Sequence, residues 1–189
     1  MRSLCHFACA LLLAAAAPAA TAAHDISTSE KIEADGTTTL THEALVDAKP
    51  AELWQAISTA EGWMKWAVPV AWHSPSDPDV LETSYDANDK PGSPNTIQQR
   101  FLVRLPERLL AFRTIKAPEG FPNWDAYSRV TSIFELEPAG QQTRLRLTST
   151  GYPDSEAGRQ LVRFFEQGNA QTLAQLQTLF RPSPTPAEE

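Results

Sequence analysis

Residues 154–180 read DSEAGRQLVRFFEQGNAQTLAQLQTLF, which is the longest helical pattern in the chain. Apolar side chains recur there at intervals of three, four or twice four, the spacing of one face of an α-helix: Leu161, Phe165, Leu173, Leu176 and Phe180. Asp154 can cap the start of this helix, and Pro182 stops its end. The pattern predicts one long helix packed along the face of a sheet.

Two residues interrupt the apolar face of this helix. Asn169 stands four positions after Phe165 and four before Leu173, and Gly168 precedes it. A glycine inside a helix costs about 1 kcal/mol relative to alanine, and a buried amide must find hydrogen-bond partners. Two interpretations are open: Asn169 is a satisfied amide in a filled core, or the helix faces a cavity at this point.

Residues 1–23 have the pattern of a secretory signal peptide, with Arg2, an apolar run at 8–17 and small residues at 20–23. The apolar run is too short to span a bilayer. We predict cleavage after Ala22 or Ala23, a periplasmic or secreted location, and no membrane insertion after cleavage. Both cysteines, at positions 5 and 9, lie in this segment, so the mature chain has no thiol for a disulfide or a metal.

The composition of the whole chain is typical of one globular domain. The chain has 189 residues, of which 42% are apolar and 21% charged, and its net charge is −7. An acidic surface argues against nucleic acid as a partner. We predict a flexible leader at 24–36, a folded domain at 37–180 and a disordered tail at 181–189.

The folded part begins with a strand and two short helices. Residues 37–46 alternate between apolar and polar, which predicts a half-buried strand with His42 on its apolar face. Pro50 suits the first position of a helix, and a second short helix is expected from Thr59. Four of the five tryptophans lie between positions 54 and 72, either in the core or around an apolar pocket.

About six strands in hairpin succession follow, at 68–85, 96–116 and 130–150. Hairpins imply antiparallel pairing, and helices on one face of such a sheet define an α+β domain.

The central hairpin allows two registers. In a regular hairpin Arg113 faces Phe101 and lies inside, whereas a one-residue bulge places Phe112 inside instead. Gln99 is a polar residue on the predicted inner face. The loop at 117–127 carries Phe121, Trp124 and Tyr127, which either pin the loop or form a lid.

Three segments resemble the activator of Hsp90 ATPase homologue (AHSA1-like) group of the START-like (SRPBCC) superfamily. They are LVDAKPAELWQAISTAEGWMKW (45–66), LPERLLAFRT (105–114) and FELEPAGQQTRLRLTSTGYP (134–153). The resemblance extends over residues 37–180. It implies a helix-grip fold, in which a curved antiparallel sheet wraps around the C-terminal helix and leaves a cavity for an apolar or amphipathic molecule.

This chain departs from the group at two positions. The group often has tryptophan where Arg113 and Asn169 stand here, so the resemblance implies a more open and wetter pocket. An exported chain would also not meet cytosolic Hsp90.

The chain carries no recognisable catalytic or phosphate-binding motif, and its scattered histidines predict no metal site. We therefore expect a non-enzymatic binding protein without cofactor, whose ligand is a small apolar or amphipathic molecule, with anionic molecules among the candidates. One alternative is a hydrolase or cyclase that uses His42 as acid or base and Arg113 as charge stabiliser. Another is an interaction module that modulates a protein partner. The candidate ligand-binding residues are His42, Trp66, Gln99, Phe101, Arg113, Trp124, Phe165, Asn169 and Leu173.

Overall fold

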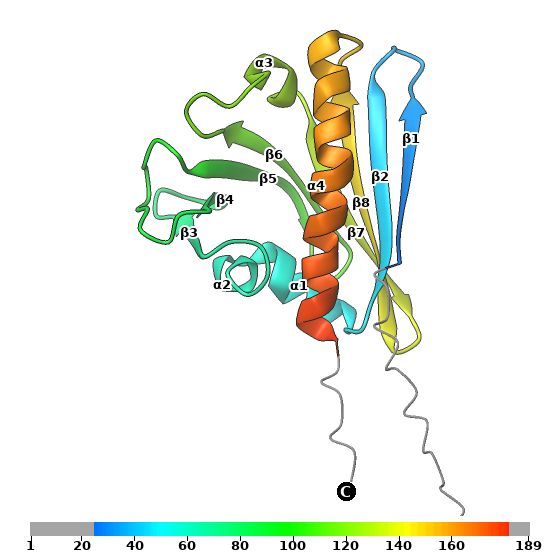
Figure 1. Ribbon diagram of the computed structural model, residues 1–189. Coiled ribbons are helices and arrows are strands. Elements are labelled where there is room, and N and C mark those ends of the chain that lie inside the picture. Colours follow the sequence, from blue (N-terminus) through cyan, green and yellow to red (C-terminus); the bar gives the residue numbers. More distant parts are fainter. Residues whose placement is uncertain (1–24, 182–189) are drawn as a thin grey trace, which may run out of the picture.

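The computed structural model describes residues 25–181. Eight antiparallel strands form one sheet in the order β1-β2-β8-β7-β6-β5-β4-β3, and the long helix α4 crosses its concave face (Figure 1). The strands are β1 (Ile26–Ile32), β2 (Thr38–Val46), β3 (Val70–Ser74), β4 (Asp77–Ser84), β5 (Ile97–Leu105), β6 (Leu109–Lys116), β7 (Thr131–Ala139) and β8 (Gln142–Tyr152). The helices are α1 (Pro50–Ser58), α2 (Ala60–Trp63), α3 (Trp124–Tyr127) and α4 (Glu156–Phe180). This is the α+β helix-grip fold.

Helix α4 buries the face that the spacing predicts, because Leu161, Leu173 and Leu176 are almost inaccessible to solvent. Its start differs from the prediction by one residue. The cap is Ser155, whose Oγ accepts a hydrogen bond from Gly158 N at 3.1 Å. Asp154 instead pairs with Arg159 at 2.9 Å.

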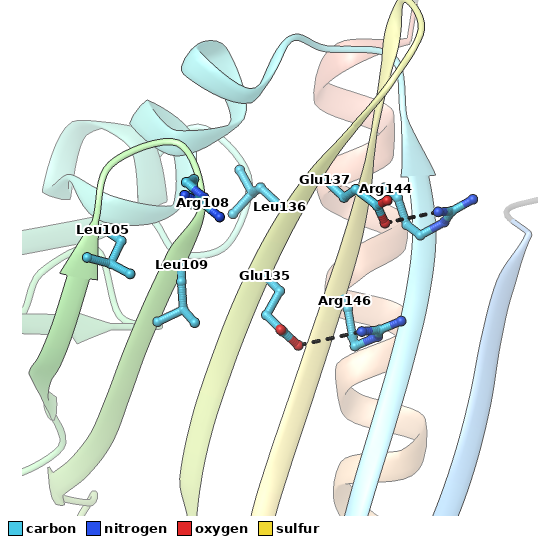
Figure 2. Close-up of a pocket in the computed structure, with 8 residues that line it drawn as sticks. All are labelled: Leu105, Arg108, Leu109, Glu135, Leu136, Glu137, Arg144 and Arg146. Carbon is cyan, nitrogen blue, oxygen red and sulfur yellow. Dashed lines mark hydrogen bonds and ion pairs between the residues drawn. The ribbon is translucent and has the colours of Figure 1, made fainter.

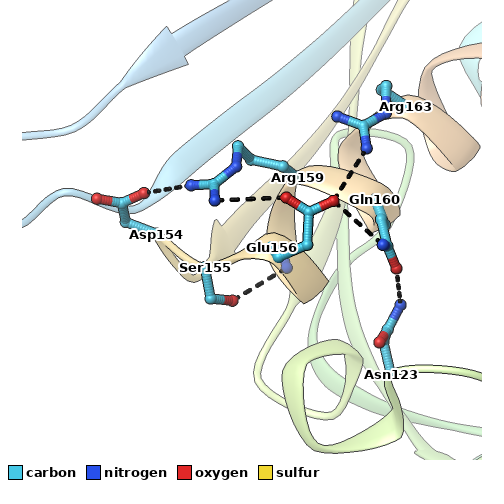
Figure 3. A network of polar contacts seen from close by, with 8 residues as sticks. Asn123, Asp154, Ser155, Glu156, Arg159, Gln160 and Arg163 are labelled. Atoms are coloured by element: carbon cyan, nitrogen blue, oxygen red, sulfur yellow. Dashed lines mark hydrogen bonds and ion pairs between the residues drawn. The ribbon is translucent and has the colours of Figure 1, made fainter.

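Charged and amide side chains surround the start of α4 (Figure 3). Glu156 lies 3.5 Å from Arg159 and 3.5 Å from Arg163, and it accepts a hydrogen bond from Gln160 at 3.1 Å. Asn123, just before α3, donates to Gln160 at 3.1 Å. Most of these groups are exposed, so each contact adds little stability, and the Asn123–Gln160 hydrogen bond links the α3 segment to α4.

The two short helices are held by tryptophan side chains. Trp63 donates its indole N–H to Ile57 O at 2.7 Å, and Trp66 donates to Ala56 O at 3.0 Å. Thr59 caps α2 by accepting from Gly62 N at 3.0 Å. A Cβ at Gly62 would lie 2.1 Å from Gln55 O, so α1 and α2 can pack this closely only with glycine there.

The predicted flexible leader at 24–36 is wrong for most of its length. Residues Ile26–Ile32 form β1, which pairs with β2 from Ile26 opposite Ala44 to Ile32 opposite Thr38. Only Ile26 is partly buried, and it packs against the main core. Backbone hydrogen bonds to β2 hold this edge strand, and almost none of its side chains is buried. The sequence therefore shows no apolar alternation in this segment. The predicted signal peptide and the tail after residue 181 lie outside the described residues.

The hairpin β5–β6 is bulged at two places. The register passes from Phe101 opposite Phe112 to Val103 opposite Ala111, which leaves Leu102 as the extra residue. A second shift, between Gln98 and Gln99, lies nearer the open end of the hairpin. The bulges reverse the side-chain alternation that a regular hairpin predicts.

Arg113 consequently lies outside, where it is exposed and donates to Thr131 Oγ1 at 2.8 Å. Phe112 takes the inner position, as the bulged alternative required. Val103 and Leu105, which the alternation places inside, are exposed for the same reason. The last hairpin keeps a regular alternation, with these inner residues buried: Phe134, Leu136, Leu145 and Leu147.

Candidate functional site

A cavity of about 300 Å³ lies between the middle of α4 and the concave face of the sheet. Helix α4 contributes Phe165, Gly168 and Asn169 to its wall, and the loop 117–121 covers another side. Its volume is at the lower end of the range for small-molecule sites. Gly168 and Asn169, the two residues that interrupt the apolar face of the helix, both lie in this wall.

Aromatic rings make up nearly half of the cavity lining. They come from α2, α3, α4, three strands and the adjoining loops: Trp63, Trp66, Tyr85, Phe112, Phe121, Tyr127, Phe134, Tyr152, Phe164 and Phe165. Tyr127 stacks on Phe165 with ring centroids 4.7 Å apart, and Phe121 lies 5.3 Å from Tyr127. These contacts bring the loop that follows β6 against α4, where it closes one side of the cavity.

Most polar groups in the lining have partners of their own. Thr114 donates to the Tyr127 hydroxyl at 3.2 Å, and the hydroxyls of Ser132 and Ser149 lie 3.2 Å apart. Burial raises the pKa of Tyr127 and also that of Tyr152, so both phenols are neutral at physiological pH. Among the residues that the structure describes, no charged side chain lines the cavity.

Two amides in the lining differ from these paired groups. Gln99 on β5 is only 9% exposed, and its Oε1 has no hydrogen-bond partner within residues 25–181. Asn169 on α4 is half-buried. Next to it, a Cβ built on Gly168 would meet no atom within 4 Å, so the cavity wall is open there.

The mouth of the cavity carries two exposed aromatic side chains. Tyr85 follows β4 and is 74% exposed, and Phe164 of α4 is 62% exposed. Both belong to the lining, so they connect the buried rings with the surface.

His42 is buried beneath α4 but is not part of the cavity wall. Its Nε2 donates to the carbonyl oxygen of Glu166 at 2.9 Å, and its Nδ1 has no partner among the described residues. Burial lowers the pKa of His42, which is therefore neutral near pH 7. The histidine joins β2 to the helix as a buried, hydrogen-bonded residue and does not act as a ligand contact in the cavity wall.

The other predicted site residues fall into two groups. Trp66, Gln99, Phe165 and Asn169 meet at the cavity. The remaining four do not line it. Phe101 and Leu173 belong to the main core, Trp124 packs edge-on against Tyr127 at 6.3 Å, and Arg113 lies on the outer surface.

The sequence-based prediction missed several lining residues. Ser132 and Ser149 share the inner alternation of Phe134 and Leu147, so strand periodicity could have identified them. Tyr152 extends the same inner face at the end of β8, but the bend at Gly151 hides it from a simple alternation.

A second hollow lies on the outer face of the sheet (Figure 2). Leu105 and Leu109 border it together with charged side chains, several of which are paired. Arg144 contacts Glu137 at 3.0 Å, and Arg146 contacts Glu43 at 2.5 Å. Because arginine and glutamate side chains make up much of this hollow, whereas aromatic rings line the inner cavity, the inner cavity is the better candidate for an apolar ligand.

The described residues contain no group of three or more histidine, cysteine, aspartate or glutamate side chains that could hold a metal ion. None of the helices within 25–181 has the length and apolar character needed to cross a membrane.

The helix-grip sheet and its inner cavity define a START-like domain. Within that class, the model of the activator of Hsp90 ATPase homolog 1-like proteins matches residues 47–181. The chain belongs to this family. A comparison with curated proteins gave no match.

Several solved structures share the fold at low sequence identity. A protein from Arthrobacter aurescens has a TM-score of 0.62 at 16% identity, covering 82% of this chain and 90% of its own. The Aha1 dimer from Colwellia psychrerythraea gives 0.57 at 15%, covering 78% and 98%. CalU16 from Micromonospora echinospora gives 0.56 at 17%, covering 85% and 87%. At these identities the likeness establishes the fold alone.

Proposed function

We propose that this protein binds a small, uncharged and largely apolar molecule in the cavity between α4 and the sheet. The observation that carries the proposal is the lining itself, which combines ten aromatic side chains with no charged one. Such a lining removes apolar surface from water, and it provides ring faces for stacking.

The amino-terminal pattern at 1–23 adds that the protein works after export, in the periplasm or outside the cell. The lining narrows the ligand class that the sequence suggested. With Arg113 on the outer surface, an anion in the cavity would lose its hydration without gaining a cationic partner. We therefore expect a neutral ligand and not an anionic one.

A cavity enzyme is the less favourable function. That hypothesis needed His42 as the acid or base and Arg113 as the charge stabiliser, and neither side chain borders the cavity. Binding without chemistry accounts for the aromatic walls and the paired hydroxyls.

A fluorescence titration tests the proposal. N-phenyl-1-naphthylamine is a neutral apolar dye whose emission rises in apolar surroundings, and we expect saturable binding to the wild type. Gly168→Phe should abolish the saturable signal, because the new ring extends from an open wall of the cavity. Gly168→Ala is the matched control and should retain binding.

Unfolding midpoints of both variants show whether the fold is intact. Equal dye binding by the wild type and a folded Gly168→Phe variant would contradict the proposal. Mass spectrometry of the gently purified protein provides an independent check, since a retained neutral molecule is expected and a charged one would contradict the assignment.

A further inference from the structure

The side chain of Gln99 is an unused hydrogen-bonding group within the cavity wall. It is nine-tenths buried, it borders the cavity, and its Oε1 has no partner within the described chain. Buried polar groups in folded proteins are nearly always hydrogen-bonded, so an orphan amide at a ligand site requires an explanation.

The neighbourhood of Gln99 explains why the amide has no partner. Gln99 is opposite Thr114 in the β5–β6 pairing. The hydroxyl of Thr114 is already engaged, because it donates to the Tyr127 hydroxyl at 3.2 Å. Farther along the wall, Ser132 and Ser149 pair with each other. None of these contacts supplies a donor to Gln99 Oε1, so this buried acceptor is left to whatever occupies the cavity.

We propose that Gln99 selects ligands that carry a hydrogen-bond donor, such as a hydroxyl or N–H group, on an uncharged aromatic framework. This inference rests on the proposed function and specifies its ligand class. A donor on the ligand satisfies Oε1, whereas an apolar analogue leaves the buried acceptor unpaired. Sites that are built to hydrogen-bond a ligand group discriminate strongly against analogues that lack it.

The aromatic character of the expected ligand is inferred from the rings in the cavity wall. Rings from α4, α3 and the sheet face the cavity from several sides, and they favour offset or edge-to-face contacts with a planar ligand. Neutrality follows because no charged side chain in the lining could compensate an ion.

The test compares 2-naphthol with 2-methylnaphthalene, a pair that differs in a hydroxyl against a methyl group of similar size. Each dissociation constant is measured by fluorescence titration near neutral pH, and the readout is their ratio in each protein. Transfer of each probe out of water costs the same free energy in every titration. A change in the ratio of the two dissociation constants between variants therefore reports a change in the cavity.

Gln99→Leu should shift the ratio towards 2-methylnaphthalene by about fivefold or more, the equivalent of one neutral hydrogen bond. Asn169→Leu is the matched control, because it removes the other amide of the lining, and its ratio should remain within about twofold of the wild type. Gln99→Met repeats the test with an unbranched apolar side chain and provides the measurement if Gln99→Leu does not fold.

The outcomes separate this inference from the function on which it rests. If both probes bind and the ratio is unchanged in the Gln99 variants, the selectivity inference is overturned while the binding function stands. An equal or larger shift in Asn169→Leu also overturns it, since the donor would then be recognised from α4. If neither probe binds the wild type, the proposed function itself fails.

Discussion

Gly158 and Gly168 occupy the same helix for different reasons. At Gly158 a Cβ would lie 1.9 Å from the carbonyl oxygen of Pro153, so the chain can enter α4 closely only past a glycine. At Gly168 a Cβ would meet nothing within 4 Å. Close packing therefore requires the first glycine, whereas the second leaves room in the cavity.

This difference predicts opposite effects of the same substitution. Gly168→Ala should raise the free energy of unfolding by about 1 kcal/mol, because alanine is the better helix former and no contact opposes it. Gly158→Ala should lower the free energy of unfolding, because the new methyl group collides with backbone. Urea denaturation of both variants checks the pair, and destabilisation by Gly168→Ala would show that packing constrains this position too.

His42 makes the stability of the protein depend on pH. Burial lowers the pKa of His42 in the folded state below its ordinary value of about 6.5. Between these two pKa values the unfolded chain binds more protons than the folded protein, so stability rises with pH. The contribution is fully present above about pH 6.5 and is lost as the pH falls towards the folded-state pKa.

We expect the wild type to lose more stability than His42→Leu when the pH is lowered from about 7.5 to about 5.5. The difference between the two proteins isolates the histidine, because their carboxylates are the same. It cannot exceed about 1.4 kcal/mol per pH unit for a single proton. Parallel loss of stability in both proteins, measured by urea denaturation, would refute the assignment.

Helix α4 contributes Leu161 and Val162 to one buried cluster and Leu173 and Leu176 to the main core. Leu176 is fully buried, so Leu176→Ala should cost about 2–5 kcal/mol through lost burial and the cavity left behind. The exposed Gln175 on the same turn provides the control, and Gln175→Ala should change stability by no more than about 0.5 kcal/mol. Similar denaturation midpoints for the two variants would mean that the buried face of α4 is wrongly assigned.

The sequence predicts those elements whose apolar residues recur with the period of their secondary structure. The α4 face and the hairpin of β7 and β8 follow their periodicity, because recurring residues such as Leu161, Leu176 and Phe134 are buried in the core. The register of β5 and β6 was not predictable from alternation. A bulge at Leu102 changes the face of every residue beyond it, yet the apolar pattern of the sequence fits either register.

The same physical limit applies to the candidate site. Gln99 and Asn169 were identified because each places an amide on an otherwise apolar face, and Phe165 because it continues the apolar face of α4. The structure brings all three together at the cavity. Arg113 was a candidate only in the regular register, and the bulged register that the structure has places it on the outer face. His42 was identified as unusual, but a sequence does not show whether a buried imidazole meets a cavity or a helix carbonyl.

In the whole molecule, the amino-terminal strands extend the sheet beyond the segment that defines the family. The family match begins at Asp47, directly after β2. Strand β2 joins β8 and carries His42 beneath α4, and β1 covers the outer edge of β2 (Figure 1). Because β1 is polar except at its ends, it closes this edge with a surface that does not favour further pairing.

This arrangement predicts the effect of removing β1. A chain that begins at Gly36 should be less stable than one that begins at Asp25 by about 1–3 kcal/mol, because it loses the burial of Ile26 and the ladder to β2. It should also self-associate as its concentration rises, since the exposed edge of β2 can pair with another copy. Urea denaturation and sedimentation velocity measure the two effects. A monomeric truncated chain with an unchanged midpoint would show that β1 neither stabilises nor protects the sheet.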